Sequence, residues 1–265
     1  MTTAIQRGRI ASPSEAEALA AVRAIGFAKT QQEAWSAFLA IVARYGFDRV
    51  NYSFVPDLRD PDHPSRSQRF TLSSHPAPRV REIYRSDLLD RSPMRRWASE
   101  NSGAISWSEQ PRLMREYGME ADGPALNALL AELGFQAGWT LGFPALSGAG
   151  KGSMGLTARA DLDQAAADAI WARHGPALEA LAATVHGGLS RMPLPVGGGE
   201  LTPRQREVLG WIADGKSVRD VALLTGLSIS GTEKRLRELR SVLGVETTAH
   251  AVARAAFLNQ LTLPE

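Results

Sequence analysis

Four polar side chains recur at a helical spacing near the end of the chain, namely Ser230, Lys234, Arg237 and Ser241. Steps of three and four residues place them on one face of a helix, with Glu238 beside them. Arg and Lys can donate hydrogen bonds to guanine O6 and N7, and a serine hydroxyl can donate or accept. This face therefore has the chemistry needed to contact base edges in the major groove of DNA.

A helix-turn-helix pattern is predicted to position this face. Ala222 is a small residue where two helices would cross, and Gly226 follows four positions later, where the turn needs a positive φ. Apolar residues are expected to fill the inside of the turn and the buried stripe of the following helix: Val221, Leu224, Leu227, Leu236, Leu239 and Leu243. The polar set on the opposite face would then be open to DNA.

Further cationic and hydroxyl groups are expected to hold the DNA backbone. Arg235 and Arg240 flank the polar face, and Lys216 and Ser217 stand at the start of the preceding helix, where backbone N–H groups attract phosphate. The complete set of expected DNA contacts is Lys216, Ser217, Ser230, Lys234, Arg235, Arg237, Arg240 and Ser241. Because one recognition helix reads only a few base pairs, we expect a homodimer that binds an inverted repeat of double-stranded DNA.

The region after residue 200 resembles the C-terminal helix-turn-helix domain of the LuxR family. The resemblance is carried by LTPRQREVL at 201–209, WIADGKS at 211–217 and LGV at 243–245. It implies four helices, of which the third is the recognition helix. The last, at roughly residues 249–258, is implied to take part in dimerisation.

Three positions depart from the family's pattern. Gln205 stands where the family has Glu, Thr232 where it has Val, and Glu233 where it has Lys. Thr232 is expected to weaken the packed side of the recognition helix slightly. Ser230 with Glu233 has the spacing of a capping box, so capping the helix is one role open to Glu233.

The part of the chain before residue 191 mixes helical and strand patterns. Ser14 with Glu17 and Thr30 with Glu33 have the spacing of capping boxes, and Gly46 ends the second of these helices. Strands are predicted at 47–55, 69–74, 104–108, 137–146 and 152–159. In the first strand Tyr52 alternates with Asn51 and Ser53, which would lie on the other, polar face.

These elements predict an α+β protein with two domains. A helix is predicted over 162–189, kinked or divided by Pro176, so that residues 1–191 form an α-β-α sandwich with an antiparallel sheet. Pro and Gly residues mark a linker at 192–199. Residues 200–265 complete the chain as an all-α, four-helix helix-turn-helix domain.

The first domain resembles the acyl-homoserine lactone-binding domain of the LuxR family, whose signature is Tyr-Pro-x-x-Trp-x-x-x-Tyr followed by Asp-Pro and a Trp. Here His75-Pro76 stands for Tyr-Pro, and Arg79 stands for the first Trp. Ile83 takes the place of the Tyr, Ser92-Pro93 takes that of Asp-Pro, and Trp107 is retained. The frame of the signature is present, but most of its side chains differ.

The substitutions change the expected ligand chemistry. In the family the Asp accepts the ligand's amide N–H, whereas the hydroxyl of Ser92 lacks the charge that strengthens such a bond. Arg79 can donate to a carbonyl or pair with an anion. Three interpretations stay open: a different small ligand, loss of ligand control, or a lactone held by substituted contacts. The expected lining is Tyr52, His75, Arg79, Ile83, Tyr84, Ser92, Met94, Trp107, Leu126, Leu130, Phe135, Thr140 and Thr157.

Composition excludes other classes of function. The chain has no cysteine, which excludes disulfides and thiol nucleophiles, and its five histidines lack the spacing of metal ligands. The stretch from Gly148 to Gly155 lacks the Lys-Ser/Thr of a P-loop. We therefore expect no catalytic, metal or cofactor site and no enzyme. A further alternative is an interaction protein that sequesters another regulator of this type.

Charge and hydropathy say more about the cellular compartment of the protein than about whether it binds nucleic acid. The formal net charge is only +2, so it does not by itself indicate nucleic acid binding. The polar N-terminus lacks a signal peptide, and no apolar run approaches the ~20 residues that a membrane span needs. A cytoplasmic protein with no membrane partner is expected.

Overall fold

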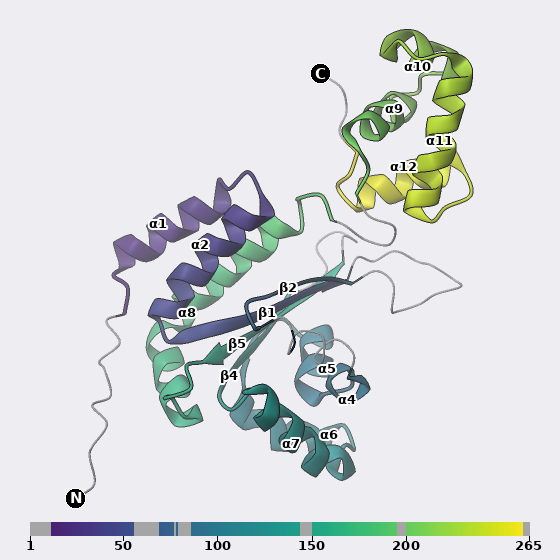
Figure 1. Cartoon of the computed structure of the whole chain (residues 1–265). Coiled ribbons are helices and arrows are strands. Elements are labelled where there is room, and N and C mark those ends of the chain that lie inside the picture. Colours follow the sequence, from purple (N-terminus) through teal and green to yellow (C-terminus); the bar gives the residue numbers. More distant parts are fainter. Residues whose placement is uncertain are drawn as a thin grey trace, which may run out of the picture. The chain divides into compact units, whose positions relative to one another are not determined.

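The computed structural model describes residues 12–55, 69–76, 78, 86–143, 150–194 and 200–261. They form two compact units (Figure 1), and the chain passes from the first to the second between Leu189 and Ser190. Within the described ranges, no helix combines the length and the apolar character needed to cross a membrane.

A five-stranded sheet lies at the centre of the first unit. Its strands are β1 (Phe47–Val55), β2 (Phe70–Ser73), β3 (Gly103–Ser106), β4 (Gly138–Phe143) and β5 (Lys151–Ala158). Their order across the sheet is β2-β1-β5-β4-β3, and β4 pairs antiparallel with both β3 and β5. Ile105 lies opposite Thr140, and Gly138 lies opposite Thr157. The predicted α+β class with an antiparallel sheet is confirmed.

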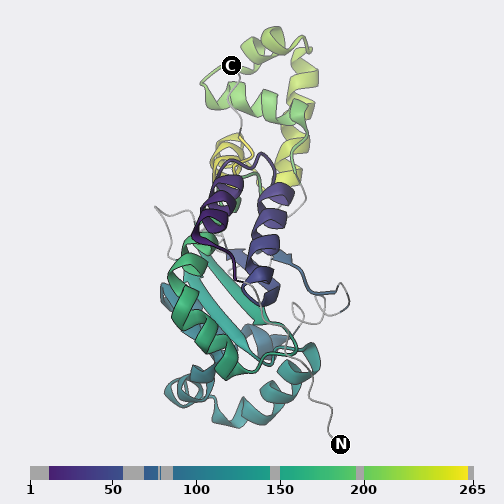
Figure 2. The ribbon, with the colours of Figure 1, turned by 90° about the vertical axis from the view of Figure 1, so that its left-hand side faces the viewer.

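Helices cover both faces of this sheet, as a sandwich requires (Figures 1 and 2). On one face lie α1 (Glu15–Gly26), α2 (Gln31–Arg44) and α8 (Gln164–Leu189). On the other lie α4 (Asp87–Asp90), α5 (Pro93–Glu100), α6 (Gln110–Glu116) and α7 (Gly123–Leu133), with the short 3-10 helices η1 (Trp107–Glu109) and η2 (Glu120–Asp122). The apolar faces of α2 and α8 are buried, which accounts for their stability.

Local predictions in this unit hold with three corrections. Ser14 and Glu17 form a capping box, but the Glu33 carboxylate accepts from the backbone N–H of Lys29 rather than from Thr30. The strand predicted at 104–108 ends at Ser106, where η1 begins. Pro176 does not divide α8, because residues buried on both sides of it hold the helix in place.

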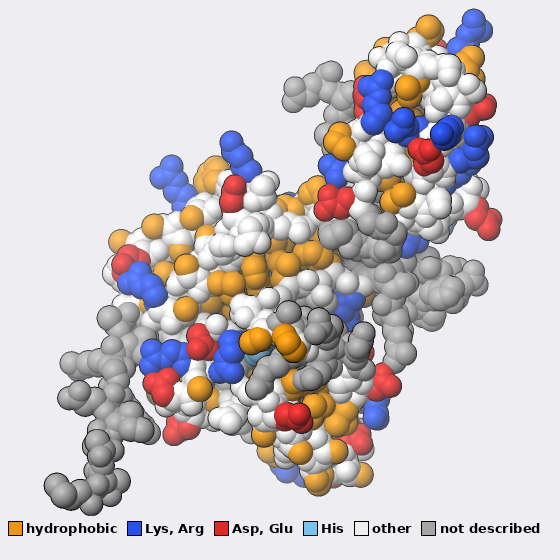
Figure 3. Space-filling view, viewed as in Figure 1, with side chains coloured by type: hydrophobic (Ala, Val, Ile, Leu, Met, Phe, Trp, Pro, Cys, Tyr) orange, Lys and Arg blue, Asp and Glu red, His pale blue; other side chains and the backbone are white. Residues whose placement is uncertain are grey.

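The second unit contains four helices, as predicted. They are α9 (Pro203–Ala213), α10 (Val218–Thr225), α11 (Ile229–Leu243) and α12 (Thr248–Phe257). Each begins at a Ser or Thr whose side chain accepts a hydrogen bond from the helix's first turn, namely Thr202, Ser217, Ser228 and Thr247. Buried apolar side chains join the helices, and Lys and Arg side chains stand on the surface of the unit (Figure 3).

The segment that follows α8 is bound to the end of this second unit. The backbone N–H of Leu194 donates to the carbonyl of Leu258 at 2.9 Å. The fully buried Gln260 side chain donates to the carbonyl of Leu194 at 2.7 Å and accepts from the N–H of Leu201 at 2.9 Å. Asn259 donates to the carbonyl of Ser190 at 2.8 Å. The first residues of the expected linker are therefore held on the C-terminal unit.

Candidate functional site

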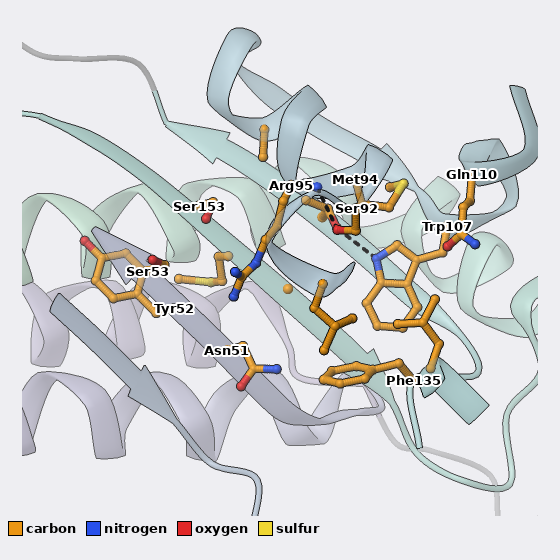
Figure 4. A pocket seen from close by; sticks show the side chains of 16 residues that line it. Asn51, Tyr52, Ser53, Ser92, Met94, Arg95, Trp107, Gln110, Phe135 and Ser153 are labelled. Atoms are coloured by element: carbon orange, nitrogen blue, oxygen red, sulfur yellow. Dashed lines mark hydrogen bonds between the residues drawn. The ribbon is translucent and has the colours of Figure 1, made fainter. Parts of the chain in front are cut away.

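A cavity lies in the first unit between the sheet and the helices α4 to α7 (Figure 4). It contains about 770 Å³ of empty space, counting the part open to solvent. Strands β1, β4 and β5 form its floor. The helices contribute Leu89, Ser92, Met94, Arg95, Ala98, Trp107, Gln110 and Leu130 to its walls.

One end of the cavity is aromatic and apolar. The indole N–H of Trp107 donates to Thr140 Oγ1 at 2.8 Å, which fixes the ring against the sheet. Phe135 meets it edge to face, with 5.9 Å between ring centroids. Gly138 makes this packing feasible, because a Cβ at that position would lie 2.9 Å from the Trp107 ring and 2.2 Å from the Leu156 carbonyl.

The other end of the cavity is polar. In Figure 4 the Arg95 side chain extends away from Trp107 toward the part of β1 that carries Ser53 and Asn51. Its guanidinium forms a short ion pair with Asp90. Ser153 completes the polar lining from β5. The cavity thus offers an apolar surface at one end and hydrogen-bond donors at the other.

A buried polar pair connects the floor of the cavity to α8. Tyr52 Oη lies 2.9 Å from His186 Nδ1, and the two side chains are 0% and 5% exposed. The His186 ring stacks on Phe143 at 4.3 Å between centroids. Burial lowers the pKa of His186 from its usual 6.5 to about 4 and raises the pKa of Tyr52. Burial thus keeps both groups uncharged at neutral pH.

The structure brings together seven of the residues expected to bind a ligand. The cavity is lined by Tyr52, Ser92, Met94, Trp107, Leu130, Phe135 and Thr140. Two of them have other structural roles as well, since Tyr52 bonds His186 and the Ser92 hydroxyl caps α5 by accepting from the N–H of Arg95. Whether these residues hold a ligand stays a prediction.

The other expected ligand residues do not line the cavity or lie outside the described ranges. His75 is buried against Phe135, with 4.8 Å between ring centroids. Leu126 belongs to an apolar cluster with Leu89, Met114 and Leu133, and Thr157 is fully buried in the sheet. Arg79, Ile83 and Tyr84 lie outside the described residues.

Sequence reasoning missed the polar end of the cavity. The alternation in β1 correctly separated Asn51 and Ser53 from Tyr52, but this polar face borders the cavity instead of open solvent. Arg95 was the detectable signal, because it follows the Ser92 cap by three residues and so lies on the first turn of α5. Only the tertiary fold brings it to β1 and β5.

In the second unit, α11 has the two faces that its sequence predicts. Leu236, Leu239 and Leu243 are buried. The opposite face exposes the expected base-contacting residues Ser230, Lys234, Arg237 and Ser241. Lys234 and Arg235 both lie near Glu238, at 3.9 Å and 3.8 Å from its carboxylate oxygens.

The expected phosphate-binding residues lie in three settings. Ser217 caps α10, and its hydroxyl and N–H both donate to the Asp220 carboxylate, which lowers the pKa of Asp220. Lys216 precedes that cap and lies 3.3 Å from an oxygen of Asp214. Arg240 is turned to α12, where it donates to Thr248 Oγ1 at 3.1 Å. Arg240 is thus the least available of the set.

Two details of the turn were predicted differently, whereas Thr232 lies on the packed side of the helix as expected. The capping box of Ser230 with Glu233 is wrong, because Ser228 caps α11 by accepting from the N–H of Gly231 at 3.0 Å. Leu224 is 51% exposed and does not fill the turn. Thr232 is fully buried, but its hydroxyl donates to the carbonyl of Ser228 at 3.1 Å, so it leaves no unsatisfied group.

The turn between α10 and α11 otherwise follows the predicted pattern. Ala222 is buried at the helix crossing, and Gly226 ends α10 with a φ of 70°. An L-residue with a side chain adopts this left-handed conformation at a cost, which explains the glycine.

Comparisons with known proteins agree with this architecture. Residues 30–189, more than half of the chain, match the family model of the autoinducer binding domain. The transcriptional activator protein BjaR1 of Bradyrhizobium diazoefficiens is 26% identical over 242 residues, which cover 90% of this chain and 93% of BjaR1.

Solved structures of low sequence identity share the fold. Escherichia coli SdiA matches with a TM-score of 0.51 and 12% identity, over 93% of this chain and 98% of its own. SdiA in complex with octanoyl-rac-glycerol gives a TM-score of 0.52 at 12% identity, over 93% and 96%.

A third solved structure, the N-acylhomoserine lactone-dependent LuxR family factor CepR2 of Burkholderia cenocepacia, matches with a TM-score of 0.50 and 18% identity, over 66% of this chain and 94% of its own. The family match spans the unit that holds the cavity. The chain therefore belongs to the LuxR family of transcriptional regulators and carries an autoinducer-binding domain.

Proposed function

We propose that this protein binds double-stranded DNA through α11 and that its DNA binding responds to a small molecule held in the cavity. The observation that carries the proposal is the two-faced character of α11. Its leucines are buried, while Ser230, Lys234 and Arg237 are exposed on the opposite face. A helix that leaves short polar and cationic groups outward on one face suits major-groove recognition.

A homodimer on an inverted repeat follows from the size of this face. One recognition helix contacts only a few base pairs, so specific binding normally uses two half-sites about one helical turn apart. Because such a protein acts on DNA inside the cell, we place it in the cytoplasm. Its partners are then a second copy of the chain, DNA and the small molecule.

The cavity supports ligand binding over loss of ligand control. Its lining, mostly apolar side chains with a few hydrogen-bonding groups, is typical of small-molecule sites. The residues that line the cavity depart from the family signature. Ser92 replaces the acidic residue, and its hydroxyl already caps α5. We therefore propose a small signal other than a standard acyl-homoserine lactone.

Selection from a random duplex pool by the purified full-length protein tests the DNA-binding part. We expect an enriched palindrome. Replacing Arg237 by Ala should weaken binding to that palindrome by about 1–3 kcal/mol, because the guanidinium's bonds to a base are lost. Arg23→Ala, which removes an exposed arginine of α1, is the matched control and should bind as the wild type does.

Two outcomes would contradict the assignment. Unchanged affinity of Arg237→Ala would remove α11 as the reading element. A folded dimer that selects no sequence, with or without acyl ligands, would favour the alternative in which the protein sequesters another regulator, and the carboxylates Glu233 and Glu238 on the exposed face of α11 would then have a simple explanation.

A further inference from the structure

The two ends of the cavity differ in a way that bears on the ligand. Trp107, Phe135 and Leu130 offer aromatic and aliphatic carbon at one end. At the other end the Arg95 guanidinium reaches toward β1 (Figure 4). A ligand that fills the whole cavity must therefore match two different chemistries.

The polar end is rich in groups that can donate. Among the described residues, the hydroxyls of Ser53 and Ser153 have no hydrogen-bond partner, and neither does the amide nitrogen of Asn51. The Asn51 oxygen, in contrast, accepts from Ser73 at 2.5 Å. Together with Arg95, these groups line the cavity with N–H and O–H donors.

The Arg95 guanidinium already has a carboxylate partner. Arg95 forms its ion pair with Asp90, and the two side chains are 25% and 29% exposed. A second carboxylate brought to this partly buried pair would lose solvation and would lie close to the negative charge of Asp90. A neutral oxygen acceptor, such as a hydroxyl or a carbonyl, fits the site better than a carboxylate does.

Resting on the proposed ligand-binding role of the cavity, we infer that its signal is an elongated molecule whose head group lies beside Ser92 and Trp107, two positions of the family signature, and whose chain ends in a neutral oxygen. Arg95, Asn51, Ser53 and Ser153 bind that oxygen. The apolar end of the cavity holds the opposite end of the molecule against Trp107 and Phe135. A ligand with a plain hydrocarbon tail would exclude water from these donors without offering them an acceptor, which weakens its binding.

Calorimetric titration of the full-length protein with matched probes tests this inference. The probes are N-octanoyl-homoserine lactone and 1-octanoylglycerol, each with its 8-hydroxyoctanoyl form. We expect the hydroxylated form of at least one pair to bind about tenfold more tightly or better, as a hydrogen bond to a charged donor predicts. Equal affinities, or preference for the plain chain in both pairs, would overturn the inference while leaving the cavity a ligand site.

Variants then locate the preference. In Arg95→Met with Asp90→Asn the ratio between the two forms should fall to about one, because the charged donor is lost together with its counter-ion. The matched control removes the neighbouring exposed pair, which spans 3.5 Å, as Arg91→Met with Asp122→Asn, and should keep the ratio. If the first variant does not fold, Ser53→Ala with Ser153→Ala should lower the ratio, and an unchanged ratio in that variant would contradict the site.

Failure of all four probes to bind the folded wild type would overturn the ligand-binding role proposed for the cavity, and this inference with it. Binding without preference would overturn only the inference. The two failures are therefore distinguishable.

Discussion

The two units of this protein place the polar groups of their candidate sites differently. The first unit encloses a cavity and directs Arg95, Asn51 and Ser153 toward it, so its chemistry faces inward. The second unit packs its leucines closely and presents Lys234 and Arg237 on the surface of one helix. A site for a small molecule needs a concave, partly dry space, whereas a site for DNA needs a convex element that enters a groove. The contrast indicates two separate sites in one chain.

A leucine-to-alanine substitution should lower the free energy of unfolding by different amounts in the two units. Leu239→Ala removes a fully buried side chain from a closely packed site, so the free energy of unfolding of the second unit should fall by about 2–5 kcal/mol. Leu130→Ala removes a partly buried side chain that already borders empty space, so the first unit should lose less than about 2 kcal/mol.

Hydrogen exchange followed by mass spectrometry measures both units in the intact chain. If Leu130→Ala lowers the free energy of unfolding as much as Leu239→Ala does, the region around the cavity is packed as tightly as the C-terminal core, and the contrast between the units is wrong.

Acid should weaken the first unit through His186. In the unfolded chain a histidine takes up a proton near pH 6.5, whereas folded His186 does so only near pH 4. Between these values the unfolded state binds more protons, so stability falls as the pH is lowered through this window, by about 3 kcal/mol in total.

The double variant Tyr52→Phe with His186→Phe removes both members of the buried pair and should abolish this share of the pH dependence. Unfolding measured by hydrogen exchange at pH 7 and pH 4 gives the difference between wild type and variant. An equal loss of stability in both proteins would show that His186 is not held uncharged.

A more local effect is predicted for the first residues of the expected linker. Gln260→Ala leaves the N–H of Leu201 and the carbonyl of Leu194 without their partners, which should cost about 1–3 kcal/mol. Amide exchange in residues 190–194 should speed up, while exchange in the first unit stays the same. Asn127→Ala, which removes an exposed side-chain hydrogen bond to Gln110, is the control. Unchanged exchange at Leu194 would mean that Gln260 does not hold this segment.

The two candidate sites differ in how far they could be predicted from the sequence. The faces of α11 depend on a helical period and on nearby residues, so the positions of Lys234 and Arg237 follow from spacing alone. The strands and the sandwich also follow from local periods. The polar end of the cavity joins Arg95 on α5 to residues of β1 and β5, and no local pattern records which helix the fold brings to which part of the sheet.

Smaller errors have similar causes. Pro176 was expected to kink or divide α8, and it does not divide the helix, because tertiary packing on both sides overrides the local preference. Ser230 and Ser228 are both good capping residues, and only the backbone shows that the helix begins after Ser228.

The most direct test of the account measures DNA affinity while the cavity is open or filled. Gly155 lines the cavity, and a Cβ added there meets only the Trp107 ring, at 3.9 Å, so Gly155→Leu should place its side chain in the empty space. The full-length wild type is titrated into its selected duplex with and without the four octanoyl probes. We predict that at least one probe changes the wild-type affinity about fivefold or more and has no effect on Gly155→Leu. A wild type that ignores every probe, or an equal response in both proteins, would contradict control of DNA binding by this cavity.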